Sequence, residues 1–182
     1  MRVISGKYKR LELSGFDIDG IRPTMDKVKE SIFGIIQNKI KDSVCLDLFS
    51  GTGSLGIEAL SNGAKYVYFV DNMNSAIEIT KKNLNKIKDN NYTIVNDNYT
   101  SSLKKFSNNN TKFDIIFIDP PYKDDIAVSS VDLILSLKLL KKEGIIIIET
   151  DEKNREIENL KNLDIEVYDI RKYGRANLIF LN

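Results

Sequence analysis

Compact apolar runs alternate with helical patterns along most of this chain. The runs are continuous and short, at 44–49, 66–70, 93–95, 114–118 and 144–149. Apolar residues recur at helical spacing between them, near 54–62, 75–88 and 125–140, with a shorter piece at 100–106. Continuous apolar strands separated by helices are typical of a parallel sheet covered on both faces. The pattern therefore predicts a doubly wound, mostly parallel α/β domain of the Rossmann-like type.

The two ends of the chain have different patterns. Near the C-terminal end, 164–172 and 176–181 alternate around Tyr173-Gly174-Arg175, which predicts an antiparallel hairpin at one sheet edge and brings the sheet to seven strands. At the N-terminal end, 2–13 alternates loosely around Gly6 and predicts two short strands of a hairpin or of an extended arm. Residues 24–40 predict an amphipathic helix that Thr24 caps.

Length and composition limit the possible classes of protein. A chain of 182 residues fits a single domain, which we divide into an N-terminal basic arm and helix (1–41) and a Rossmann-like core (42–182). One Cys and no His exclude a disulfide framework and His-based catalysis, and leave no expectation of a metal site. No apolar run approaches the length of a membrane span. We expect a cytoplasmic protein that makes no membrane contact.

The net charge of +1 conceals an uneven distribution. Residues 1–41 carry 9 basic and 5 acidic groups, whereas 42–150 carry 12 and 14, and 151–182 carry 6 and 7. A basic segment in an otherwise acidic chain predicts contact with a polyanion; a solvated surface is the simpler interpretation. The candidate nucleic-acid contacts are Lys7, Lys9, Arg10, Arg22 and, in the tail turn, Arg175.

A glycine-rich loop follows the first strand. Ser50-Gly51-Thr52-Gly53-Ser54-Leu55-Gly56 contains G-x-G-x-x-G between a strand and a helix, the setting in which this motif binds cofactors. Glycines permit a tight turn and let a ligand approach the backbone and the helix N-terminus. The motif alone also fits a packed turn.

Carboxylates around the loop favour one cofactor over another. Asp71 ends the second strand, 20 residues after Gly51, where an acid commonly binds ribose hydroxyls. Asp47 precedes the loop; it would repel the pyrophosphate of NAD but suits the ammonium and sulfonium groups of S-adenosylmethionine. Asp97 follows the third strand, within reach of an adenine amino group. Each acid also has a simpler interpretation, as a turn residue or a helix N-cap.

The fourth strand ends in Asp119-Pro120-Pro121-Tyr122. Ligands in an open parallel sheet bind outside the carboxyl ends of the strands, where both this motif and the glycine loop are expected. Asp119 and the Pro120 carbonyl could together hold an exocyclic amino group, and Tyr122 could stack on a base. The alternative is a rigid turn in which Tyr122 packs on the fold.

These motifs together resemble a known family. Asp-Pro-Pro-Tyr with this glycine loop is similar to amino-group methyltransferases, and LDLFSGTGSLGIEALSNGA (46–64) with IRPTMDKVKESIFGII (21–36) resembles the bacterial 16S ribosomal RNA guanine-N2 methyltransferases of the RsmD type. The opening MRVISGKYKRLEL and the closing KYGRANLIFL also follow that family. The likeness extends over nearly the whole chain.

The resemblance implies a monomeric enzyme that transfers a methyl group from S-adenosylmethionine to the exocyclic N2 of a guanine in 16S rRNA, as naked rRNA or in the small ribosomal subunit. Two sets of residues are implied. Cofactor binding falls to Asp47, Ser50, Gly51, Gly53, Asp71 and Asp97, and the target base to Asp119, Pro120 and Tyr122. The segments Asn72-Met73-Asn74 and Asn96-Asp97-Asn98 depart from the family pattern.

Other functions remain open at this point. The same chemistry could act on adenine or cytosine in DNA, or on a protein glutamine, although the chain has no room for a DNA target-recognition domain. A non-catalytic RNA-binding module could retain the fold. An NAD-dependent oxidoreductase is disfavoured by Asp47 and by the lack of an evident proton donor.

Overall fold

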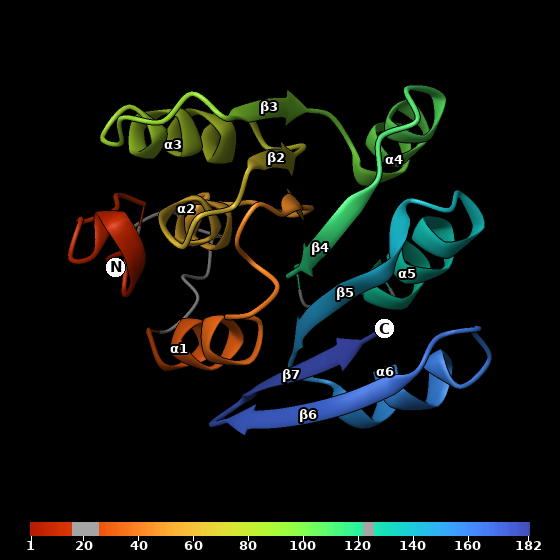
Figure 1. Ribbon diagram of the computed structural model, residues 1–182. Helices are drawn as coiled ribbons and strands as arrows, with labels where there is room; N and C mark the ends of the chain where they lie inside the picture. The colour runs from red at the N-terminus through yellow and green to blue at the C-terminus, as the bar shows by residue number, and fades with distance from the viewer. Residues whose placement is uncertain (16–25, 122–125) are drawn as a thin grey trace.

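The computed structural model describes residues 1–15, 26–121 and 126–182, and it contains a seven-stranded sheet between two layers of helices (Figure 1). The strands are β1 (Val44–Asp47), β2 (Tyr66–Asp71), β3 (Tyr92–Asn96), β4 (Phe113–Ile118), β5 (Leu140–Thr150), β6 (Val167–Tyr173) and β7 (Ala176–Leu181). Their order is β3-β2-β1-β4-β5-β7-β6, and β7 pairs antiparallel with both of its neighbours while the other pairs are parallel. The predicted doubly wound α/β fold is confirmed.

Six α-helices of the described residues cover the sheet. They are α1 (Asp26–Ile35), α2 (Ser54–Ser61), α3 (Asn74–Leu84), α4 (Tyr99–Asn108), α5 (Ile126–Ser136) and α6 (Lys153–Leu160). The first three pack on one face of the sheet and the last three on the other, as Figure 1 shows. Both faces of the central strands are therefore buried, which explains their continuous apolar sequences. None of the described helices is long and apolar enough to cross a membrane.

The sheet order creates a switch point between β1 and β4. The helix after β1 lies on one face and the helix after β4 on the other, so the chain leaves these adjacent strands in opposite directions. Open α/β sheets bind their ligands in the crevice that forms there, outside the carboxyl ends of the strands.

Several predicted boundaries differ from the structure. The helix predicted over 125–140 ends at Ser136, because Lys138 takes a positive φ of 53° and Leu140 already pairs with Phe113 at the start of β5. Helix α6 was not predicted, since its sequence is mostly polar and only Ile157 and Leu160 carry the apolar pattern.

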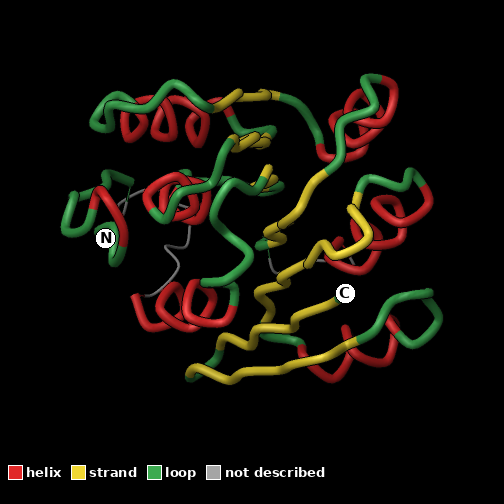
Figure 2. The backbone as a smooth tube through the Cα atoms, viewed as in Figure 1, coloured by secondary structure: helices red, strands yellow, loops and turns green. Residues whose placement is uncertain are grey.

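The N-terminal arm, residues 1–13, is not the pair of strands that its alternation predicts. Residues 1–3 and 11–13 do run antiparallel, through hydrogen bonds between Val3 and Leu11 and between Leu13 and Met1, but they form one isolated bridge. A short 3₁₀ helix, η1 (Gly6–Tyr8), separates the two halves (Figure 2). The arm packs against α2 and not onto the sheet as further strands.

Candidate active site at the strand ends

A pocket of about 690 Å³ opens at the switch point. Its lining comes from the carboxyl ends of the first four strands and the loops that follow them, and it includes Asp47, Ser50, Gly51, Asp71, Asp97, Asp119 and Pro120. This volume suits a molecule of cofactor size. The structure thus brings seven of the predicted site residues into one pocket. Tyr122 and Arg22 lie outside the described residues.

Two glycines of the loop have backbones that other residues rarely adopt. Gly51 has a φ of 52° and Gly53 a φ of 76°. Gly56 is required for a different reason, because a Cβ atom there would lie 2.2 Å from Cε1 of Phe69 in β2. The third glycine therefore permits close packing of α2 on the sheet, while the first two shape the turn.

Asp47 joins the end of β1 to the first turn of α2. Its Oδ2 accepts a hydrogen bond of 2.9 Å from the backbone N–H of Gly56, and the residue is 2% exposed. Burial, followed by the nearby charge of Asp71, raises the pKa of Asp47 to about 7, against the opposing effect of the Gly56 N–H. A cationic ligand beside this buried carboxyl group would favour its charged form and so lower its pKa.

Asp71 holds two parts of the site together. Its Oδ2 accepts from the N–H of Gly51 at 2.9 Å and its Oδ1 from the N–H of Met73 at 2.9 Å. Each carboxylate oxygen can accept a further hydrogen bond. The contact of Asp71 with a pair of ligand hydroxyls stays a prediction.

Two buried hydroxyl groups in the pocket lack a partner. Ser50 and Ser54 are 7% and 4% exposed, and neither Oγ atom makes a hydrogen bond within the described structure. Ser54 is the first residue of α2, where backbone N–H groups and the helix dipole favour an anion. An amino-acid carboxylate would satisfy these donors, while Asp47 suits the ammonium group. The residues present therefore fit the amino-acid end of S-adenosylmethionine.

Asp97 is engaged more fully than its predicted role requires. Its carboxylate accepts from Lys105 Nζ at 2.7 Å, from Ser101 Oγ at 2.8 Å and from the N–H of Asn98. The ion pair with Lys105, then the other two bonds, lower the pKa of Asp97. Asp97 thus holds the first turns of α4 in place, and its contact with an adenine stays a prediction.

Sequence reasoning missed an aromatic pair in the pocket. The rings of Phe49 and Tyr99 have centroids 5.5 Å apart and both residues line the pocket. Thr52, Ser54, Met73 and Ile126 also line it. The available signal was position, because each of these residues follows or closely neighbours a strand end.

The predicted basic residues lie at different edges of the sheet. Lys7 pairs with Asp89 at 2.6 Å, in the segment that precedes β3, and the backbone N–H of Tyr8 donates to Ser61 Oγ at the end of α2. Lys7, and with it the exposed Lys9 and Arg10, therefore lies toward the amino ends of the strands, away from the pocket. Arg175 lies at the carboxyl edge, in the β6–β7 turn.

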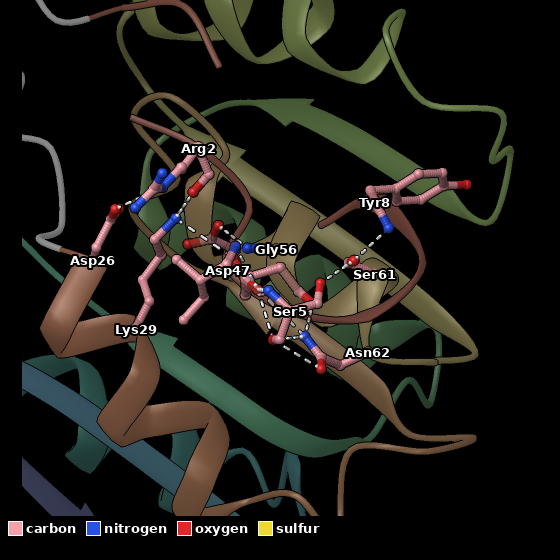
Figure 3. Close-up of polar contacts among 11 residues, drawn as sticks. Arg2, Ser5, Tyr8, Asp26, Lys29, Asp47, Gly56, Ser61 and Asn62 are labelled. Atoms are coloured by element: carbon pink, nitrogen blue, oxygen red, sulfur yellow. Dashed lines mark hydrogen bonds and ion pairs between the residues drawn. The ribbon is translucent and has the colours of Figure 1, made fainter. Parts of the chain in front are cut away.

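A buried ion pair fastens the arm to the helices. Lys29 of α1 and Glu58 of α2 are both fully buried, with Nζ 3.4 Å from Oε2. Glu58 also accepts from the N–H groups of Ile4 and Ser5, and Lys29 donates to the carbonyl of Arg2 (Figure 3). Burial lowers the pKa of Lys29 despite the attraction of Glu58. We call Lys29, Glu58, Ile4 and Ser5 the arm knot.

Comparison with known proteins identifies the family of this chain. The sequence profile of the family described as "Conserved hypothetical protein 95" matches residues 1–182. The chain belongs to this family.

Two curated proteins that are similar to this chain are named as methyltransferases of the small ribosomal subunit RNA. "Ribosomal RNA small subunit methyltransferase D" of Haemophilus influenzae is 35% identical over 83% of this chain and 79% of its own length. The Escherichia coli protein of the same name is 32% identical over 85% and 76%. The solved structure titled "Putative methyltransferase yhhF from Escherichia coli" has a TM-score of 0.84 at 26% identity, over 100% of this chain and 96% of that one. The resemblance noted in the sequence is confirmed.

Proposed function

We propose that this protein transfers a methyl group from S-adenosylmethionine to the exocyclic N2 of a guanine in 16S rRNA. The observation that carries the proposal is that Asp47, Asp71 and Asp119 line one pocket, in a chain whose relatives bear the name of a small-subunit rRNA methyltransferase. We further propose that it acts as a monomer in the cytoplasm, on rRNA or on the assembled small subunit.

The residues of the pocket divide the binding of the cofactor between them. Asp71 accepts from the ribose hydroxyls, Asp47 faces the ammonium group, and Ser50 and Ser54 donate to the carboxylate. S-adenosylmethionine supplies an electrophilic methyl group on a sulfonium centre. Its orientation therefore depends on groups that the fold already holds rigidly, as the hydrogen bonds to Gly51 and Gly56 indicate.

Asp119 and Pro120 act on the target base. The lone pair of guanine N2 is delocalised into the ring, so the amine is a poor nucleophile. Hydrogen bonds from N2–H to the Asp119 carboxylate and the Pro120 carbonyl would favour a pyramidal nitrogen that points at the methyl group. Methyl transfer then depends on the alignment of the nitrogen with the methyl group and on electrostatic stabilisation of the transition state, more than on a strong base. Asp119 or water takes the proton that leaves the methylated amino group. Tyr122 stays our prediction for the residue that stacks on the base.

Asp119→Ala tests this assignment. We expect transfer of labelled methyl to 16S rRNA or small subunits to fall by about 100-fold or more, because the variant loses both the group that aligns the guanine amine and its charge. Cofactor affinity by calorimetry and the melting temperature should stay near those of the wild type. Nucleoside mass spectrometry then identifies the methylated base. If the wild-type protein binds RNA but methylates none, the chain is a binding module and the proposal is wrong.

The arm's role in RNA binding also stays a proposal. Lys9 and Arg10 are exposed, whereas Lys7 already neutralises Asp89. Because all three lie toward the amino edge, we expect them to contact only RNA that extends well beyond the target loop. Lys9→Glu with Arg10→Glu should weaken binding of long rRNA fragments at low salt, and equal affinities would contradict this.

A further inference from the structure

The turn between β6 and β7 lies at the carboxyl edge of the sheet, on the same edge as Asp119. The registers place Ile118 opposite Ile148, Glu149 opposite Leu178, and Tyr173 opposite Ala176. Asp119 is therefore level with Glu149 and Leu178, and the turn begins beyond that level. At about 3.4 Å per residue, the tip of the turn projects about 10 Å past Asp119, two strands to the side.

The turn is held firmly and not left as a loose loop. Asn177, which is 6% exposed, donates from Nδ2 to the carbonyls of Thr150 and Arg175, each at 3.2 Å. Tyr173 packs against the core on the α1 face. The bond from Asn177 to the Thr150 carbonyl ties the turn to the end of β5, so the sheet fixes the position of the turn relative to Asp119.

The turn presents two cations to solvent. Lys172 and Arg175 are exposed, and neither side chain has an ion pair or hydrogen bond within the described parts of the chain. Around Gly174, at a φ of 61°, a Cβ would meet nothing within 4 Å. By contrast, Arg2 pairs with Asp26, and Lys7 pairs with Asp89. The cations of the turn are thus available to a ligand.

The charge of the neighbouring pocket explains why free cations in the turn would matter for binding a nucleic acid. Asp47, Asp71, Asp97 and Asp119 all line the pocket, and of these Asp97 is paired with Lys105, so carboxyl groups outnumber cations at the strand ends that a polyanion would approach. A nucleic acid that delivers a base to Asp119 must bring its phosphates close to these groups. Cations placed beside the pocket would offset that repulsion and fix the strand's direction.

We propose that the β6–β7 turn, through Lys172 and Arg175, binds the phosphates that flank the target base. This rests on the proposed function, since it assumes a single-stranded RNA substrate. The turn then determines which way an unpaired loop enters the site, while base recognition stays with the residues after β4.

The test is RNA binding by the full-length protein with the demethylated cofactor product present. The probe is a fluorescent stem-loop short enough to cover only the carboxyl edge, titrated at several salt concentrations. The variant is Lys172→Glu with Arg175→Glu. A control of equal charge change is Lys65→Glu with Lys88→Glu, exposed lysines that precede β2 and β3 at the amino edge. The conservative pair is Lys172→Arg with Arg175→Lys.

We expect the turn variant to bind at least 10-fold more weakly at low salt and to lose about 1.4 from the salt slope, at about 0.7 for each single-strand phosphate contact. The conservative pair should restore binding, and the amino-edge control should bind like the wild type. Cofactor affinity should be equal in all of them, which shows that folding is intact. Methylation by the turn variant should show a raised KM at an unchanged kcat.

Two results would overturn the inference. In one, the turn variant binds the stem-loop as the wild type does. In the other, the amino-edge control loses as much affinity as the turn variant, so that only net charge matters. The proposed function fails separately, when the wild-type protein transfers no methyl group to RNA.

Discussion

Asp47 combines a structural contact with a titration near neutral pH. It caps α2 through Gly56 and faces the pocket, and burial raises its pKa to about 7. Below that pH the free protein holds a neutral carboxyl group, which attracts a cationic ligand less. A bound cation favours the carboxylate, so binding releases a proton on the acid side of pH 7.

We therefore expect the affinity for S-adenosylmethionine to rise as the pH increases from 5 to about 7 and to level off above it. Calorimetry in buffers of different ionisation enthalpy measures both the affinity and the released proton. Asp47→Asn keeps an acceptor for the Gly56 N–H and should bind weakly with no such pH dependence. A wild-type affinity that is constant from pH 5 to 8 would separate Asp47 from the ligand.

The unpartnered hydroxyl of Ser54 gives a second prediction. Its removal takes no hydrogen bond from the parts of the chain that the structure describes, so Ser54→Ala should unfold at the same temperature as the wild type or higher. The affinity for the cofactor should fall about 2- to 10-fold, as for one lost hydrogen bond. Ser102→Ala removes another buried, unpartnered hydroxyl, in α4 and outside the pocket, and should leave the affinity unchanged.

Among the elements, the arm depends on the arm knot. Glu58 accepts from two backbone N–H groups of the arm as well as from Lys29, so its removal leaves several buried donors unsatisfied at once. Glu58→Ala should lower the free energy of unfolding in urea by about 3–5 kcal/mol. Lys81→Met, which breaks the exposed pair with Glu78, should cost less than about 1 kcal/mol. Equal costs for the two variants would show that the arm knot contributes little.

The sequence predicts the sheet and the loop because their signals are local. Apolar runs mark buried strands, and Gly51, Gly53 and Asp71 stand at fixed distances along the chain. The arm knot could not be found in this way, since Lys29 and Glu58 are separated by other elements and meet only when α1 and α2 pack together. Likewise, the end of α5 depends on Leu140 pairing with Phe113, a tertiary contact that overrides the helical pattern.

For the whole molecule, cofactor binding should be visible as added stability. A ligand at 100 times its Kd that binds only the folded state adds about 2.7 kcal/mol, which for a domain of this size raises the melting temperature by about 5–10 °C. S-adenosylmethionine should produce this shift and NAD should not. Asp71→Ala should reduce the shift, because it removes the acceptor for the ribose hydroxyls. A shift with NAD would favour the oxidoreductase instead.

The position of β7 has a consequence for how the chain reaches its fold during synthesis. It follows the other six strands in the sequence, yet it lies between β5 and β6 in the interior of the sheet. Until it is inserted, the apolar residues Ile146–Ile148 of β5 present an open edge on the nascent chain, a hazard for aggregation. The sheet is therefore complete only after this segment has emerged from the ribosome, and until then the edge of β5 can pair with another chain.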